Sequence, residues 1–502
     1  MALITAINAQ AQVVPLRYLD EVFNSVTVDT SIVYAQNRSY FSAFGILDPL
    51  RMDVYRPAGD TATNRPVIIL MHAGSFLPGT LTGFSFADRN ENCLVEMCQR
   101  YAKRGYVAVS MSYRLGWNPS STDFDVRSGT IINAVFRAMQ DAKNCIRYFR
   151  NDVQNGSNQW GVDGNKFILG GSNSGAYVAL AAGNLNKPAE IEIAKVTDIN
   201  GIPYIDTTKV GNFEGYNGSQ NHNNYVTDSA FVRIDTVDLG GGNFQYDSVW
   251  YYTGLSAAFN GVLALGGAVA DTTIIEAGEP PVISFQGVNE GLTPFNTAVV
   301  VTSTFNPVIE VSGAGDYMPI VDNIGNNAVF SPNNFPAGPK NRHQTDVTYN
   351  KSFEAFYPFW GQAFEPWNWY NGTNPVFNAN ASQSKAMLYI DTIMGYSSLR
   401  LYKLLIDPNY MLPTDIREVT GKVEMSVFPN PTSGMLHVVA NSLQKPIETI
   451  SLFDITGRLA KQLNGIGEYN QTIFVNDLHT GVYMLTVKLT DGNTATQRVV
   501  VE

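Results

Sequence analysis

The chain has 502 residues, 44% of them hydrophobic and 12% aromatic, which is enough for a full-sized enzyme domain and at least one smaller domain. Its net charge of -11 excludes the basic footprint of a nucleic-acid-binding protein. No apolar run approaches the length of a membrane span, so we expect no transmembrane segment. No group of His, Asp and Glu has metal-ligand spacing, so we expect neither a metal nor a cofactor.

The N-terminus predicts the end of a secretory signal peptide at residues 1–12, MALITAINAQAQ. A short apolar run precedes the small-x-small cleavage pattern of residues 9–11. The alternative is a disordered N-terminus. Further along, Cys93 and Cys98 are close enough in sequence to bridge, but nothing fixes that pairing. We interpret these two cysteines and Cys145 as small core side chains.

Strand and helix patterns alternate along residues 52–180. The strand patterns are apolar runs typical of a parallel sheet, and the helix patterns carry an apolar stripe. We expect strands at 52–56, 66–71, 106–112 and 167–170, and helices at 92–104 and 130–151. Strands return at 262–265 and 281–285, before a closing helix at 386–406. This alternation predicts a doubly wound α/β sheet.

Residues 166–180, KFILGGSNSGAYVAL, predict a buried strand, a glycine-rich turn and a helix of small residues. This is the layout of a nucleophile elbow, the strained turn that lifts one side chain above the sheet. Gly171 and Gly175 lie two residues to either side of Asn173, which therefore occupies the tip. An asparagine has no hydroxyl or thiol that a base could activate, so the expected nucleophile is absent.

Three later stretches depart from this pattern. Residues 185–257 have little periodicity, and we expect an insertion that lies over the strand carboxyl ends as a cap. Residues 353–370 are unusually aromatic and either line a ligand cleft or fill a buried core. Short β segments separated by turns at 419–502 predict a small Ig-like β-sandwich, which leaves 13–415 for the α/β domain.

Several motifs together resemble the carboxylesterase-like α/β-hydrolases. Residues 70–76, LMHAGSF, are similar to the oxyanion-hole loop of that family. Residues 161–180, GVDGNKFILGGSNSGAYVAL, are similar to the lead-in and elbow, and residues 280–295, PPVISFQGVNEGLTPF, to the strand and turn that carry the acid. The resemblance covers most of residues 50–406 and implies a serine-hydrolase scaffold with a cap-like insertion.

Carried over residue by residue, the resemblance assigns Asn173 to the nucleophile position, Glu290 to the acid position and Phe364 to the position of the histidine base. It implies an oxyanion hole built from the backbone N–H groups of Ala73 or Gly74 and of Ser174. His72 is interpreted as bracing this loop. Since the nucleophile and the base are both substituted, the chain resembles an esterase that has lost its catalytic triad.

The alternative is an active esterase that uses a shifted frame. Ser172 would then be the nucleophile, with His343 as the base and Glu290 as the acid. His343 is the only histidine between Glu290 and the C-terminal domain. A shift of one residue turns the Ser172 side chain away from the elbow tip, which weighs against this alternative.

The C-terminal stretch resembles the sorting domain of the type IX secretion system of Bacteroidetes. The resemblance rests on FPNPTSG at 428–434, LFDITGR at 452–458 and LHTGVYMLTV at 478–487. It implies contact with the secretion machinery and export across the outer membrane of a Gram-negative bacterium, to the cell surface or the medium. An ordinary Ig-like accessory domain is the alternative.

Three functions therefore remain open. The first is an exported pseudo-esterase that binds a small ester or a carbohydrate-like ligand without cleaving it. The second is the active carboxylic ester hydrolase of the shifted frame. The third is an adhesion or structural protein of the cell surface.

Overall fold

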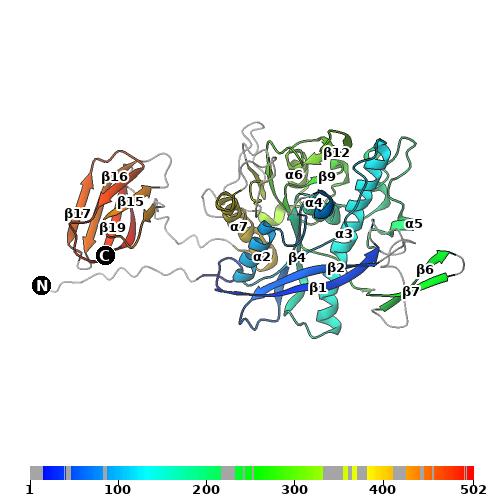
Figure 1. Ribbon diagram of the computed structural model, residues 1–502, viewed down its shortest axis with the longest axis horizontal. Helices are drawn as coiled ribbons and strands as arrows, with labels where there is room; N and C mark the ends of the chain where they lie inside the picture. The colour runs from blue at the N-terminus through cyan, green and yellow to red at the C-terminus, as the bar shows by residue number, and fades with distance from the viewer. Residues whose placement is uncertain are drawn as a thin grey trace. The chain divides into compact units, whose positions relative to one another are not determined.

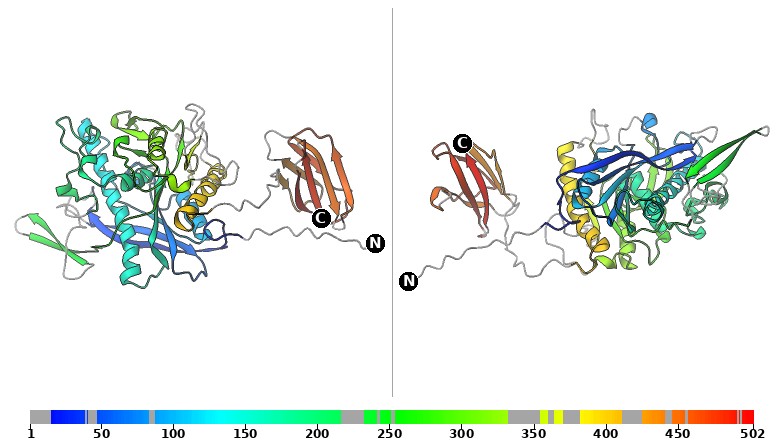
Figure 2. Two further views of the ribbon diagram at one scale, coloured as in Figure 1. Left: turned by 180° about the vertical axis from the view of Figure 1, so that it is seen from behind. Right: turned by 90° about the horizontal axis from the view of Figure 1, so that it is seen from below.

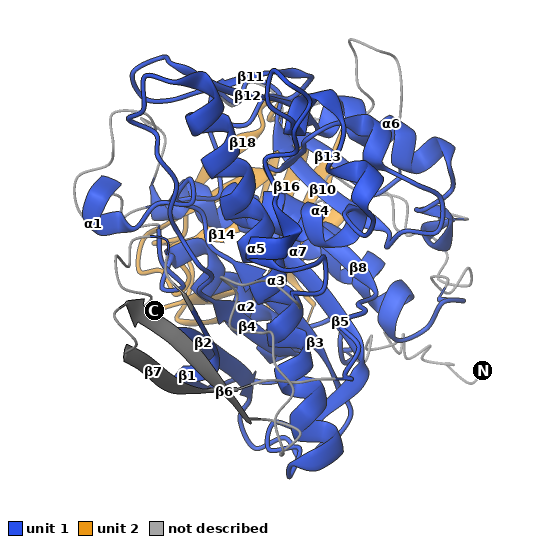
Figure 3. Ribbon diagram, turned by 90° about the vertical axis from the view of Figure 1, so that its right-hand side faces the viewer, with its two compact units in different colours: residues 1–410 blue, residues 411–502 orange. Residues whose placement is uncertain are grey.

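The computed structural model describes two compact units, Met1–Tyr410 and Met411–Glu502, which are treated separately below (Figure 3). The described residues are 15–38, 40, 47–82, 87–215, 232–240, 243–250, 254–331, 354–359, 364–369, 382–410, 425–440, 446–454, 457–490, 492 and 494–502. The predicted signal segment 1–12 lies outside them. Among the described helices, none has both the length and the apolarity needed to cross a bilayer.

The first unit is built on an eight-stranded sheet with the order β1-β2-β4-β3-β5-β8-β10-β13 (Figure 1). Its strands are β1 (Val26–Arg38), β2 (Leu47–Pro57), β3 (Arg65–Met71), β4 (Val107–Met111), β5 (Val162–Ser172), β8 (Gly261–Leu265), β10 (Val282–Gly287) and β13 (Phe356–Phe359). β2 pairs antiparallel with both of its neighbours, β1 and β4. All other neighbours in the order β4-β3-β5-β8-β10-β13 pair in parallel. The chain reverses direction across the sheet between β3 and β5, so ligands are expected where these strands end.

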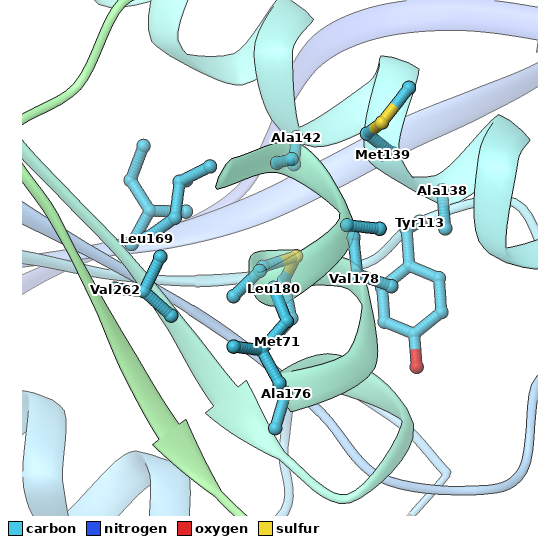
Figure 4. Close-up of a cluster of buried hydrophobic side chains, with 14 of the residues drawn as sticks. Met71, Tyr113, Ala138, Met139, Ala142, Leu169, Ala176, Val178, Leu180 and Val262 are labelled. Carbon is cyan, nitrogen blue, oxygen red and sulfur yellow. The ribbon is translucent and has the colours of Figure 1, made fainter. Parts of the chain in front are cut away.

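Helices cover both faces of the sheet, and the side chains of β3 point alternately into the two cores that form between the sheet and these helices. Ile68 and Leu70 pack with α2 (Asn92–Arg104) and α7 (Gln383–Leu405). Val67, Ile69 and Met71 pack with α3 (Phe124–Asn155), α4 (Ser174–Asn184) and α6 (Ala314–Asn323). Figure 4 shows Met71 in this core beside residues of α3 and α4. The predicted doubly wound α/β fold is thereby confirmed.

Short elements complete the first unit. They are α1 (Gly79–Thr82), η1 (Pro188–Glu190), η2 (Ala194–Val196), α5 (Thr207–Val210), β9 (Ala268–Val269), η3 (Thr272–Ile274), β11 (Ala298–Val301), β12 (Pro307–Gly313) and η4 (Ala328–Phe330). Cys93, Cys98 and Cys145 are buried and free, which confirms that they are core side chains.

Part of the insertion, in its described residues, is held along α3. The side chains of Asn133, Gln140 and Lys143 on α3 donate to the carbonyls of Tyr204, Val210 and Phe213, at 2.7 to 2.9 Å. β6 (Val232–Gly240) and β7 (Asn243–Trp250) pair as a hairpin, and β7 contacts the edge strand β1 (Figure 2). The described insertion therefore lies along α3 and beside β1, because polar side chains of a long helix offer donors to its backbone.

The elbow depends on close backbone packing at Gly175. A Cβ there would lie 2.1 Å from the carbonyl oxygen of Met71, which is rigid backbone. We expect Gly175→Ala to lower the free energy of unfolding by about 3 kcal/mol or to prevent folding. Chemical denaturation measures this, with Gly164→Ala as the control because its Cβ would meet Val153 Cγ1 at an ordinary 3.5 Å. Equal stability of the two variants would contradict the tight contact.

The second unit is all β, as predicted. One sheet has the order β14-β15-β18, from β14 (Met425–Phe428), β15 (Met435–Ala440) and β18 (Asn470–Phe474). The other has the order β17-β16-β19-β20, from β17 (Leu459–Asn464), β16 (Ile447–Asp454), β19 (Gly481–Leu489) and β20 (Thr494–Val501). Pairing is antiparallel within both sheets, and their buried residues, such as Leu436 and Leu485, form a single core.

Candidate active site

Asn173 occupies the tip of the turn between β5 and α4, with φ 46° and ψ -113°. A positive φ is rare outside glycine and is the strained conformation that an elbow imposes. The carboxamide is only 7% exposed. Its Oδ1 accepts the N–H of Ser174 at 2.9 Å, and its Nδ2 donates to Thr293 Oγ1 at 3.2 Å. The side chain thus folds back onto the elbow and caps α4.

Two buried carboxyl groups lie next to Asn173. A Cβ added to Gly266 would lie 3.2 Å from one oxygen of Glu290 and 3.4 Å from one of Glu365, so both carboxyls face one point. Burial raises the pKa of Glu290 to about 8. Burial and the charges of Glu290 and Glu91 raise the pKa of Glu365 as well. Two adjacent buried carboxylates cannot both ionise cheaply, so the pair holds a proton at neutral pH.

A third carboxyl joins this pair to the loop after β3. Glu91 Oε2 accepts the Ala73 N–H at 2.9 Å, and burial raises the Glu91 pKa to about 7. The Cys93 thiol lies 2.9 Å from Glu91 Oε1 and 2.7 Å from Asn368 Oδ1. Asn368 Nδ2 donates to Glu365 Oε2. A continuous buried polar network therefore runs from the loop to the carboxyl pair.

The backbone groups predicted for an oxyanion hole are largely engaged by the protein itself. The Ala73 N–H is held by Glu91, and the Ser174 N–H is held by Asn173. Gly74 has a φ of +115°, and a Cβ there would lie 2.5 Å from Ala87 Cβ, so only glycine fits. Two of the three donors predicted for the oxyanion hole therefore already have acceptors.

Comparison with protein families decides the relationship of the first unit. The BD-FAE family model matches residues 52–304, which span the sheet from β2 to beyond Asn173 and Glu290. The chain belongs to the BD-FAE family. A second model, the secretion system C-terminal sorting domain, matches residues 426–502. The protein is therefore an esterase-like α/β-hydrolase with a type IX sorting domain, which implies contact with the secretion machinery and export to the cell surface or the medium.

Solved structures of one esterase also match this chain, at low sequence identity and a low TM-score. Esterase 2 of Thermogutta terrifontis, phosphorylated by paraoxon, has 15% sequence identity and a TM-score of 0.36, over 78% of this chain and 97% of that chain. Its propionate-bound form has 13% identity and a TM-score of 0.35, over 78% and 97%. Likeness at this level says nothing about activity. Comparison with curated proteins gave no match.

In this BD-FAE-family chain, the resemblance assigns Phe364 to the position of the histidine base. The side chain that lies next to Glu290 and interacts with Asn173 is that of the following residue, Glu365. Glu365 is one of two charged residues in the aromatic stretch 353–370, beside Glu354, a signal that could have identified it. His343, the alternative base, lies outside the described residues.

Ser172 does not take the tip of the elbow. Its side chain is fully buried, its Oγ accepts the indole N–H of Trp367 at 3.1 Å, and it interacts with Glu365. His72 braces the loop, as predicted. It stacks on Tyr113 with ring centroids 4.5 Å apart, its Nδ1 lies 2.6 Å from the Ala73 carbonyl, and burial lowers its pKa to about 4.

The described aromatic residues of 353–370 are mainly core. Phe356 belongs to the core that contains α3 and α4. Tyr357, Phe359 and Trp367 belong to the opposite core, with α2 and α7. These four side chains do not line a cleft, so the core interpretation holds for them and the ligand-platform interpretation does not.

Proposed function

We propose that this exported BD-FAE-family protein does not hydrolyse esters by covalent catalysis and that its elbow site serves binding. The single observation that carries the proposal is Asn173 at the elbow tip, with its Oδ1 already accepting the Ser174 N–H. A carboxamide cannot be activated by a neighbouring base, and the donor that should receive the developing oxyanion is occupied.

The partner groups support this proposal. A histidine base must accept a proton from the nucleophile and return it to the leaving group. Glu365 beside Glu290 instead forms a carboxyl pair that retains a proton. The two raised pKa values make this pair a hydrogen-bond donor at neutral pH, which suits a ligand oxygen such as the carbonyl of a small ester or a sugar hydroxyl.

The test is hydrolysis of short-chain p-nitrophenyl esters by the purified protein, beside Asn173→Ser and Ser172→Ala. We expect background rates from all three, because neither change supplies a base. Turnover by the wild type that disappears in Ser172→Ala would overturn the proposal and favour the shifted-frame esterase. Turnover that persists in Ser172→Ala would also overturn it and would require a different nucleophile.

An adhesion or structural role is a second candidate, because exposed apolar side chains such as Ile199 and Phe305 are available for contacts at the cell surface. It is separated from ligand binding by thermal shift with small esters and monosaccharides. A shift that is lost in Glu365→Gln favours the elbow site, and no shift with any compound favours adhesion.

A further inference from the structure

Asn173 is held in an unusual relation to the peptide group that follows it. At its ψ of -113°, the Cα–Cβ bond and the Ser174 nitrogen are nearly eclipsed about the Cα–C bond. The carboxamide is turned toward that nitrogen, since Oδ1 accepts the Ser174 N–H at 2.9 Å. One new bond, from the Ser174 nitrogen to Asn173 Cγ, would close a nearly planar five-membered ring.

That ring is a succinimide, the intermediate through which asparagine side chains lose ammonia. Its formation is slow in most folded backbones, because ordinary helical and extended ψ values hold the following nitrogen away from Cγ. The elbow adopts the required conformation permanently, since tight packing around Gly171 and Gly175 fixes the turn. The proximity that an unfolded chain reaches only transiently is therefore built into the native state.

Two carboxyl groups near Asn173 can accept and donate the protons that ring closure requires. Glu290 and Glu365 both interact with the Asn173 side chain. Once Glu290 ionises, at about pH 8, the two carboxyls offer a carboxylate that accepts and a carboxylic acid that donates.

We propose that Asn173 is a site of self-modification. The Ser174 nitrogen bonds to Asn173 Cγ, and the carboxamide nitrogen leaves as ammonia. The Ser174 amide proton passes to the carboxylate of the pair, and the acid of the pair protonates the leaving nitrogen, so the charge of the pair is unchanged. Water then opens the ring to aspartate or isoaspartate. Opening to aspartate places a carboxylate at the tip of the elbow.

The experiment is peptide mapping of the full-length native protein during incubation near neutral pH. Trypsin releases residues 167–195 as one peptide, since Pro188 follows Lys187. We expect fragment spectra to show a loss of about 17 Da, followed by a gain of about 1 Da, at Asn173. Asn184 on the same peptide is the internal control, because its Nδ2 donates to the Leu180 carbonyl within α4.

Two comparisons separate elbow geometry from the intrinsic reactivity of an Asn-Ser pair. In urea, the rate at Asn173 should fall at least about tenfold, because the fixed ψ is lost. In folded Glu365→Gln, it should fall by a similar factor, because the carboxylic acid that protonates the leaving nitrogen is lost. An unmodified Asn173 in the native protein, or equal rates in native and urea-unfolded protein, would overturn the proposal. The wild-type comparison stands even if the variant fails to fold.

Discussion

Asn173→Ser combined with Glu365→His is expected to hydrolyse p-nitrophenyl acetate at about 10²-fold or more above the wild-type background. The serine supplies a hydroxyl at the elbow tip and releases the Ser174 N–H from the Asn173 carboxamide. The histidine replaces the side chain that lies between Glu290 and the tip, and Glu290 can orient it. Initial rates from the purified double variant measure the effect.

The matched control is Asn173→Ser combined with Phe364→His, which differs by one position. The sequence alignment favours this second pair, whereas the observed contacts of Glu365 favour the first. We expect the Phe364 pair and both single Glu365 and Asn173 variants to stay at background. Equal activity of the two double variants would show that the base position is not fixed by these contacts.

Glu365→Gln is expected to stabilise the protein at alkaline pH and to leave it nearly unchanged at about pH 5. An unfolded glutamate ionises near 4.5, whereas burial and the charges of Glu290 and Glu91 raise the pKa of Glu365 well above that value in the folded protein. Above 4.5 the unfolded state therefore binds fewer protons at this residue, so stability falls as pH rises. Each pH unit costs about 1.4 kcal/mol for as long as the folded Glu365 keeps its proton.

Urea denaturation at several pH values measures this dependence. A glutamine at 365 does not titrate, so the part of the pH dependence that comes from Glu365 is lost and the stability profile becomes flatter. Glu192→Gln is the control, because Glu192 is exposed and its loss should leave the wild-type slope unchanged. A Glu365→Gln profile parallel to that of the wild type would show that the pKa of Glu365 is not raised in the folded protein.

The sheet could be predicted from the sequence because it depends on local patterns. The apolar runs of β3 and β4 are buried along their whole length, and the alternation with α2 and α3 leaves few topologies. The elbow could also be predicted from the sequence, since only glycine fits at Gly175. The sorting domain was identified by three short motifs distributed along its strands.

The site was harder to predict, because the lengths of the loops determine which side chain lies next to Glu290. A single residue separates Phe364 from Glu365, and no local pattern specifies which of them faces Glu290. The engagement of Ala73 by Glu91 is also a contact between separate elements, eighteen residues apart in the chain. The contacts between the insertion and α3 could not be predicted for a similar reason. Its signal was the polar face of α3, where Asn133, Gln140 and Arg147 recur at seven-residue spacing.

Arg147 also binds the backbone at both ends of the segment between Glu214 and Leu255. Its Nη1 donates to the Glu214 carbonyl at 2.9 Å, and its Nε donates to the Leu255 carbonyl at 3.0 Å. One guanidinium group thus holds both ends of this segment close together. Whatever lies between these anchor points can lengthen, shorten or be exchanged without displacing a strand of the sheet. The segment between Glu214 and Leu255 is therefore a suitable place to insert a foreign sequence into this exported protein.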